Sequence, residues 1–291
     1  MEYTLTNDNI QLTVRSFGAQ MISLQDLSGK EILWQGDSQY WNEHAPNLFP
    51  YVGRTIDRHY EYNGKTYPMP LHGFACSQDF MLMSKTDDSL TLRLQNNEET
   101  EQYFPWKFYF DVTYRLNHNI VEITYTVHNI DDKKMYFGLG GHPGFCVPME
   151  KGEEFSDYRL FFPVPCHPRL VEFDTNGYCH GVKDEFILDE SYGIALSYEM
   201  FDSVTIGLTE TPGVVVLESK LSGKGVKLTY PQMDYLALWH AENTKANFLC
   251  IEPWCSLPSP AGPKTVFEEQ KDLLQLAPGK VYKNTWSIEL I

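Results

Sequence analysis

Apolar and polar residues alternate along this chain, and that pattern limits what it can fold into more than any other feature. Alternation over about four to eight residues places every second side chain on one face, as in a half-buried β-strand. Clear runs of this kind occur from one end of the sequence to the other, at 10–14, 90–94, 110–116, 121–127 and 226–230. We therefore expect a β-rich protein.

Turn signals separate these runs, and helical signals are few. Asn63-Gly64 stands between Tyr62 and Lys65, and Asn-Gly is typical of the tip of a two-residue β-hairpin. Weak helical patterns occur at 192–201 and at 266–274, the second being compatible with a short helix or a loop. No strand–helix–strand alternation is present, which argues against a parallel α/β sheet. The sequence predicts an all-β fold with little helix, in which residues 1–291 form a single large antiparallel domain of two or more stacked sheets.

The charge balance limits the possible partners. The 291 residues include 39 acidic and 23 basic ones, for a formal net charge of −16. So acidic a chain argues against nucleic acid or an anionic membrane and favours a neutral or weakly charged small molecule. No run approaches the ~18 apolar residues of a membrane span, and the N-terminus shows no signal peptide. The six cysteines are scattered without a Cys-x-x-Cys pair, so we expect free thiols and a cytoplasmic location.

Two histidines and one glutamate stand in apolar, glycine-rich or aromatic surroundings. His72 precedes Gly73, His142 lies between Gly141 and Pro143, and Glu252 follows an apolar run. An imidazole and a carboxyl group in such surroundings are the components of a proton-transfer site. Structural explanations remain open at this stage: His72 as a turn residue, and Glu252 in a buried ion pair, with Arg54 as one possible partner.

Arg54 follows an apolar run and a glycine, and it is the fourth candidate. An ion pair with Asp57 would explain it structurally, whereas a functional guanidinium would donate hydrogen bonds to substrate oxygens. Two histidines and a glutamate could also hold zinc or iron, but the sequence lacks His-x-His and His-x-x-x-His spacing, so we predict no metal site. The Gly-x-Ser-x-Gly, Walker and dinucleotide-binding patterns are missing as well.

Taken in order, several segments of the chain resemble the aldose 1-epimerase (galactose mutarotase-like) family, most closely its LacX-like branch. Each motif is weak alone, but the ordered set is specific and covers nearly the whole chain. The matching segments are Leu33-Trp34-Gln35-Gly36, Tyr40-Trp41, Ala45-Pro46-Asn47-Leu48-Phe49-Pro50, Gly53-Arg54, Tyr62-Asn63-Gly64-Lys65-Thr66-Tyr67, His72-Gly73-Phe74-Ala75, Gly141-His142-Pro143-Gly144-Phe145, Ile251-Glu252-Pro253-Trp254 and Leu276-Ala277-Pro278-Gly279.

The resemblance implies a β-supersandwich that interconverts the α and β anomers of a free aldose without a cofactor. By position, Glu252 takes the role of base and His142 that of acid, while His72 and Arg54 hold the sugar. Trp239 joins them as an aromatic candidate for sugar binding. Mutarotases carry a further sugar-binding aspartate between the acid and the base, for which the candidates are Asp184, Asp189 and Asp234.

Other functions stay open on the sequence. A related branch acts on hexose 6-phosphates and needs several basic residues near the phosphate, whereas only Arg54, Arg58 and Lys65 stand near the motifs here. A catalytically silent sugar-binding protein is the second alternative, and the presence of both His142 and Glu252 favours the enzyme over it. A metal-dependent β-sandwich enzyme is the third. The oligomeric state is left open.

Overall fold

Strands dominate the computed structural model, which describes residues 1–202 and 205–291. Strand makes up 48% of the structure and helix 6%, so the predicted all-β fold with little helix is confirmed. The alternating runs account for this result. Strand β10 (Ile120–Asn129), for example, buries every second residue along its whole length, as a strand with one face on the core must.

A nine-stranded sheet forms one layer of the fold. Neighbouring strands in it are antiparallel, and the hairpin from β9 to β10 turns tightly, with Asn117 opposite Ile120. The strands of this sheet, in spatial order, are β17 (Gly193–Ala195), β14 (Tyr158–Phe161), β19 (Val214–Ser219), β20 (Gly225–Thr229), β25 (Val281–Leu290), β10, β9 (Phe108–Asn117), β8 (Ser89–Gln95) and β7 (Met81–Lys85).

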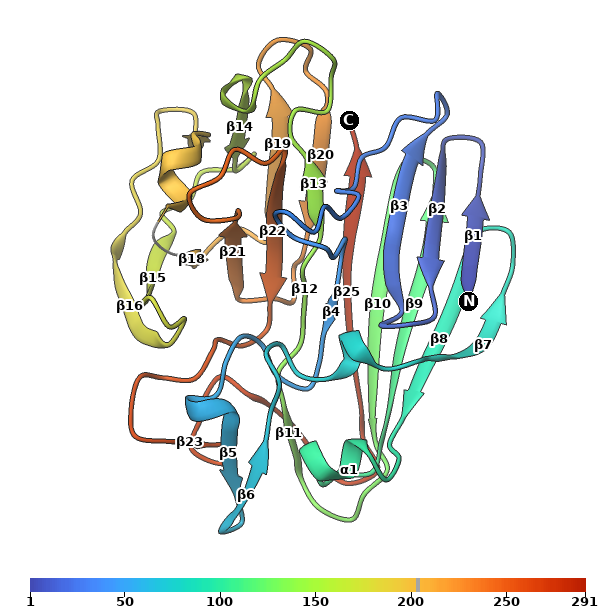
Figure 1. The fold of residues 1–291 in the computed structure, drawn as a ribbon, viewed down its shortest axis with the longest axis vertical. Coiled ribbons are helices and arrows are strands. Elements are labelled where there is room, and N and C mark those ends of the chain that lie inside the picture. Colours follow the sequence, from blue (N-terminus) through green and yellow to red (C-terminus); the bar gives the residue numbers. More distant parts are fainter. Residues whose placement is uncertain (203–204) are drawn as a thin grey trace.

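Two further sheets lie over the nine-stranded one (Figure 1). The smaller consists of β1 (Glu2–Thr6), β2 (Ile10–Arg15) and β3 (Gln20–Asp26). The larger has the order β16 (Cys179–Glu185), β15 (Arg169–Phe173), β18 (Ile206–Thr209), β21 (Tyr235–Trp239), β22 (Phe248–Trp254), β12 (Gly140–Gly141) and β4 (Asn47–Leu48), while β13 (Gly144–Cys146) also pairs with β22.

The core fills the space between these layers. Leu12 of β2 packs in the same buried cluster as Val112 of β9, and Ile251 of β22 packs in it with Trp286 of β25. The two covering sheets therefore bury one face each against the large sheet. In Figure 1 the strands β1–β3 stand in front of β8–β10, and β21 and β22 in front of β19, β20 and β25.

Short elements complete the chain. The predicted Asn63-Gly64 hairpin is confirmed, since Tyr62 at the end of β5 (His59–Tyr62) pairs with Lys65 at the start of β6 (Lys65–Pro68). The other short elements are β23 (Thr265–Val266), which pairs in parallel with β5, the pair β11 (Met135–Phe137) and β24 (Leu274–Leu276), helix α1 (Thr100–Tyr103), and the 3₁₀ turns η1 (Ile56–Arg58), η2 (Ala75–Ser77), η3 (Phe155–Asp157) and η4 (Tyr198–Phe201).

The two weak helical patterns form little helix. The segment 266–274 is not a helix; it passes from β23 through turns into β24, in agreement with the loop alternative. The segment 192–201 contains strand β17 and only the 3₁₀ turn η4. Apolar residues at helical spacing therefore served here to anchor loop segments, as Phe267 does by stacking its buried ring on Tyr60.

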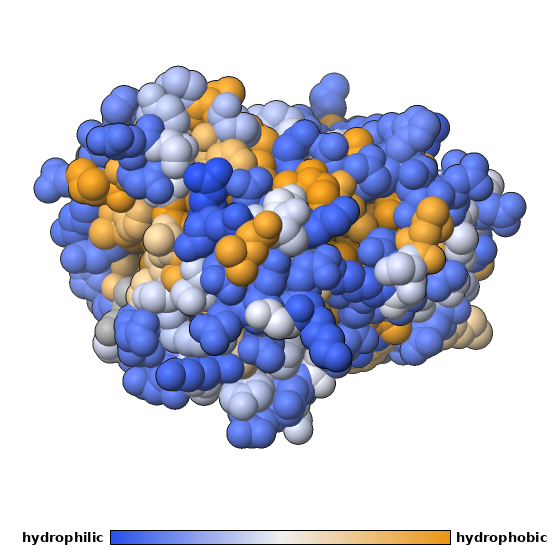
Figure 2. Space-filling model, turned by 90° about the horizontal axis from the view of Figure 1, so that it is seen from above, coloured by the Kyte–Doolittle hydropathy of each residue, from blue (hydrophilic) through white to orange (hydrophobic). Residues whose placement is uncertain are grey.

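The face seen from above in Figure 2 is mainly hydrophilic, with its hydrophobic residues scattered over several places. Scattered exposed apolar residues are normal for a folded protein. Among the described residues, none of the helices has the length and apolar character needed to cross a lipid bilayer.

Candidate functional site

A pocket of about 440 Å³ opens at the central strands of the larger covering sheet. Its lining includes residues of β4, β15, β21 and β22, and of segments that flank β4 or follow β12, β15 and β21. The structure brings all five candidate residues into this lining, although Arg54 and Glu252 stand far apart in the sequence. They are Arg54, His72, His142, Trp239 and Glu252.

Strand register explains how His142 and Glu252 meet. Strand β22 pairs with β12 through Gly140 and Trp254, and with β13 through Gly144 and Cys250. His142 lies between β12 and β13, which places it opposite Glu252 on the neighbouring strand. Its Nε2 atom lies 3.1 Å from Oε2 of Glu252. The partner of the buried glutamate is therefore His142, and the expected alternative of Arg54 is wrong.

The glycines around His142 make room for indole rings. A Cβ atom on Gly141 would lie 2.5 Å from the ring of Trp286, and one on Gly144 would lie 2.7 Å from the ring of Trp41. Side chains at these positions would collide with the packed rings. The imidazole of His142 in turn stacks on Trp41, with 5.1 Å between ring centroids and 29° between planes. The glycines thus allow the close packing that fixes the histidine ring.

Burial sets the protonation of the pair. Glu252 is 1% exposed and His142 8% exposed. Burial raises the pKa of the Glu252 carboxyl well above its usual range. Burial and, to a lesser degree, the nearby His72 lower the pKa of His142 well below the usual imidazole value. Both shifts favour the uncharged forms, because a low-dielectric site penalises a carboxylate and an imidazolium alike.

His72 is held as a hydrogen-bond donor toward the pocket. The backbone N–H of Gly53 donates to its Nδ1 atom at 3.1 Å, so the ring proton of the neutral histidine is on Nε2. Burial and, secondarily, the positive charge of Arg54 lower the pKa of His72 to about 4. The imidazole is therefore neutral at physiological pH. Its ring lies 5.3 Å from that of His142, at 89°.

Gly73 packs the His72 segment closely against the segment that follows β4. It has φ +75°, and a Cβ atom there would lie 2.2 Å from the carbonyl oxygen of Phe49. That same oxygen accepts hydrogen bonds from the backbone N–H groups of Phe74 and Ala75. Only glycine fits both the backbone conformation and the close approach, and the contact positions His72 beside the pocket.

Arg54 is exposed at the rim of the pocket. Within the part of the chain that the structure describes it forms no ion pair, so the expected bridge to Asp57 is absent. Its side chain reaches toward Gly177 in the loop after β15, since a Cβ atom at Gly177 would lie 3.9 Å from Nε. An arginine without an acidic partner at a pocket rim keeps its donors available for a ligand.

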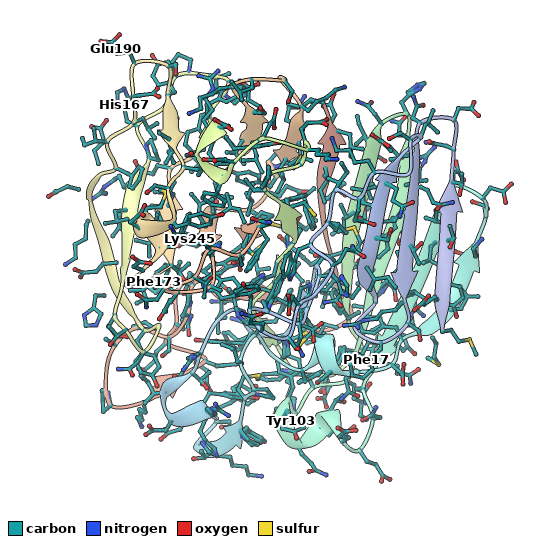
Figure 3. The ribbon with its side chains drawn as sticks, turned by 45° about the horizontal axis from the view of Figure 1, so that its top comes forward. Phe17, Tyr103, His167, Phe173, Glu190 and Lys245 are labelled. Carbon is teal, nitrogen blue, oxygen red and sulfur yellow. The ribbon has the colours of Figure 1, made fainter. Side chains whose placement is uncertain are left out.

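Aromatic side chains form much of the pocket wall. Trp239, the last residue of β21, packs edge-on against Trp41 with 5.6 Å between ring centroids. Trp41 was not among the candidate residues, although its position beside Tyr40 in a matching motif was a usable signal. Phe173 at the end of β15 is a further wall residue and is labelled in Figure 3. The loop that follows Phe173 closes one side of the pocket.

Among the acidic groups, none of the three expected aspartates lies at the pocket. Asp184, Asp189 and Asp234 are all exposed and outside the lining. Asp174, in the loop after β15, lines the pocket instead. Its Oδ1 accepts hydrogen bonds from the backbone N–H groups of Asn176 and Tyr178, as in an Asx turn. That Asp-Thr-Asn-Gly turn sequence was the signal that could have identified the loop.

Among the residues that the structure describes, one group of side chains has the donors to hold a metal ion. The ligating atoms of His142, Cys250 and Glu252 lie within 4.8 Å of one another, and all three residues are buried. Sequence spacing could not reveal this group, because His142 is far from the other two in the chain. All six cysteines are free thiols, as expected.

Comparisons with known proteins agree with the observed fold. The family model of aldose 1-epimerase matches residues 1–289. The chromosomal LacX protein of Lactococcus lactis subsp. lactis is 28% identical over the full length of both chains. A galactose mutarotase related enzyme from Lactobacillus acidophilus superposes with a TM-score of 0.93 at 31% identity, over 100% of this chain and 97% of that one. A galactose mutarotase-like protein from Lactobacillus casei gives 0.93 at 30% identity, with both chains fully covered.

Proposed function

Because the chain belongs to the aldose 1-epimerase family, we propose that it interconverts the α and β anomers of a free hexose by acid–base ring opening and reclosure. The observation that carries this proposal is the 3.1 Å contact between His142 Nε2 and Glu252 Oε2 at the pocket wall. Ring opening removes a proton from the O1 hydroxyl and delivers one to the ring oxygen. The two oxygens are bonded to the same carbon, so neighbouring acid and base groups can serve both.

We assign the base to Glu252 and the acid to His142. The carboxylate accepts the proton of the O1 hydroxyl while the imidazolium donates one to the ring oxygen. The C1–O5 bond breaks, the aldehyde rotates about the C1–C2 bond, and reclosure on the other face reverses both transfers. The catalytic pair returns to its starting protonation, so the cycle consumes no cofactor and no net proton.

The protons of the Glu252–His142 pair can be arranged in two ways. A neutral carboxyl group beside a neutral imidazole holds the same number of protons as a carboxylate beside an imidazolium. Burial favours the first arrangement in Glu252 and His142. Transfer of one proton across the 3.1 Å contact gives the second, and sugar hydroxyls that donate to the carboxylate would stabilise it.

The remaining residues would orient the sugar. His72 donates from Nε2, because its Nδ1 already accepts from Gly53. Arg54 offers its free guanidinium at the rim, and Trp41 and Trp239 provide flat apolar surfaces for the sugar ring. Asp174 is our candidate for the additional acidic contact.

Charge in the pocket favours an unphosphorylated sugar over a hexose 6-phosphate. Arg54 is the single Lys or Arg in the lining that the described residues provide, against four carboxyl groups. These belong to Glu43, Asp174, Glu242 and Glu252. Phosphate sites usually gather several Arg or Lys donors. A silent sugar-binding protein would not need the buried acid–base pair, which costs stability to keep.

The experiment that tests this function is an anomer-exchange assay on a panel of free and 6-phosphorylated hexoses. Freshly dissolved α-anomers are followed by polarimetry, or equilibrium exchange by NMR, with the spontaneous rate subtracted. We expect acceleration for at least one free hexose and a weaker effect on its 6-phosphate. Binding of a sugar without acceleration would support the silent binding protein instead. A strong preference for glucose 6-phosphate would contradict the substrate assignment.

A further inference from the structure

At the pocket wall, an imidazole, a thiol and a carboxyl group converge. We propose that His142, Cys250 and Glu252 form a binding site for a soft divalent cation, zinc above all, and that a cation bound there blocks the catalytic pair. The ligating atoms of the three residues lie within 4.8 Å of one another. The inhibition rests on the proposed function, whereas the binding itself does not.

Strand geometry builds this site. Cys250 and Glu252 stand two residues apart on β22, so their side chains point to the same face of the sheet. Trp239 of β21 is opposite Cys250 on one side, and Gly144 of β13 is opposite it on the other. The gap between β12 and β13 adds His142 on this face. All three donors thus come from paired strands or a short connection between them, which holds them rigidly.

The distances suit tetrahedral zinc. With Zn–N and Zn–O bonds of about 2.0–2.1 Å, two such ligands of one zinc ion lie roughly 3.3 Å apart. Nε2 of His142 and Oε2 of Glu252 lie 3.1 Å apart before any cation is considered. A Zn–S bond of about 2.3 Å requires the sulfur roughly 3.5 Å from the other two atoms. Cys250 therefore needs to move by little more than about 1 Å.

A buried polar atom without a hydrogen-bond partner also points to a ligand at this site. Oε2 of Glu252 is buried and accepts no hydrogen bond, although Nε2 of His142 is nearby. A buried oxygen without a donor costs on the order of 1–3 kcal/mol. A divalent cation would satisfy this oxygen directly. Its two positive charges would be balanced by the carboxylate and the thiolate, so that the buried site stays electrically neutral.

The donor set also selects the metal. A thiolate with an imidazole prefers zinc and similar soft cations over magnesium or calcium, which take oxygen ligands. On binding, the thiol proton of Cys250 and the carboxyl proton of Glu252 are both released to solvent as the S–metal and O–metal bonds form. His142 and Glu252 line the pocket, so the fourth position of the metal faces the space where the sugar would lie. Coordination removes the lone pairs that both groups need for proton transfer.

Cobalt(II) provides a test that does not depend on activity. A tetrahedral cobalt site with one thiolate shows a sulfur-to-metal charge-transfer band in the near ultraviolet, and zinc displaces the cobalt and abolishes it. We expect this band in the parent protein and its loss in Cys250→Ser. Cys255→Ser is the matched control, because Cys255 is a buried thiol just beyond β22 and outside the site. It should keep the band.

Calorimetry with zinc chloride and the inhibition assay complete the design. Cys250→Ser should weaken zinc binding by more than about tenfold, and Cys250→Ala repeats the test if the serine variant misfolds by circular dichroism. Zinc should slow anomer exchange by the parent, with recovery on adding EDTA. Absence of a cobalt band and of zinc heat in the parent would overturn the site, as would a band that survives in both Cys250 variants. If the band behaves as expected but no sugar is epimerised, the proposed function fails and the metal site stands.

Discussion

Replacing Glu252 by Gln should separate activity from stability. The amide has the shape of the carboxyl group but cannot accept the O1 proton. General acid–base catalysis is worth roughly 10²–10⁴-fold, so kcat should fall by that factor, or about 2.7–5.4 kcal/mol of transition-state stabilisation at 1.36 kcal/mol per decade. KM should change little, because Glu252 is 1% exposed and offers the sugar few other contacts.

The stability of Glu252→Gln at neutral pH should rise, whereas its activity falls. Burial raises the pKa of Glu252, so the folded protein holds this proton at pH values where the unfolded chain has released it. The fold therefore loses stability as the pH rises above the ordinary glutamate value. Gln removes that penalty. At pH 7 the variant should unfold at a higher urea concentration than the parent, and the difference should shrink as the pH approaches 4.5.

The assay is NMR exchange between anomers of the best sugar, with urea unfolding measured in parallel. Glu242→Gln is the matched control, because it makes the same change at an exposed position in the same pocket. It should keep most of the activity. If purified Glu252→Gln exchanges anomers as fast as the parent, the assignment of the base is refuted. Equal losses in both variants would indicate that pocket charge, not proton transfer, is what matters.

Four further predictions follow from the site. Arg54→Lys should raise KM with little effect on kcat, because the planar fork is lost while the charge remains. Steady-state kinetics test this, and a loss in kcat would contradict it. Activity against pH should show a broad plateau, since burial makes it hard for the Glu252–His142 pair to gain a second proton or to lose its only one; a parent profile with a single inflection near 6.5 would contradict this. His72, with a pKa of about 4 in the fold against 6.5, should cost about 2 kcal/mol of stability between pH 7 and pH 5, and His72→Asn should remove that loss in urea titrations. Gly73→Ala should destabilise the protein by more than about 2 kcal/mol, whereas Gly64→Ala, with a similar φ of +69° but open space around it, should cost only about 1–2 kcal/mol in thermal unfolding.

Local sequence pattern was sufficient to predict the strands and the hairpin. Each alternating run became a strand because burying one face of a pleated sheet requires that period. The Asn63-Gly64 turn followed from backbone conformation, since both residues have positive φ. Helical spacing at 266–274 could not decide between a short helix and a loop, because apolar residues at that spacing can equally anchor an irregular segment, as Phe267 does on Tyr60.

Pairing across the sheet was not readable from the residues. Outside hairpins, the residues alone did not show which strands become neighbours, and the contact of His142 with Glu252 depends on the register of β12, β13 and β22. For the same reason, the residues alone left Arg54 as one possible ion-pair partner of Glu252. Cys250 could not be identified as a possible metal ligand from the sequence, because it is simply one residue of an apolar run. The glycine-rich segment drew attention correctly, but the close packing that its glycines permit is against Trp286 and Trp41.

The charge states of His142 and Glu252 were the property of the site that the sequence predicted least well. Residue types predicted an imidazole and a carboxyl group in apolar surroundings, but not which of the two would carry a charge. The structure buries both groups at the pocket wall, where neither charge is well solvated, and burial drives their pKa values in opposite directions. A pair held in this way keeps one shared proton over a wide range of pH. It is therefore ready to act as acid and base together whenever a sugar hydroxyl supplies the missing hydrogen bond. The Glu252 oxygen that lacks a hydrogen-bond donor is also the atom that the proposed divalent cation would satisfy.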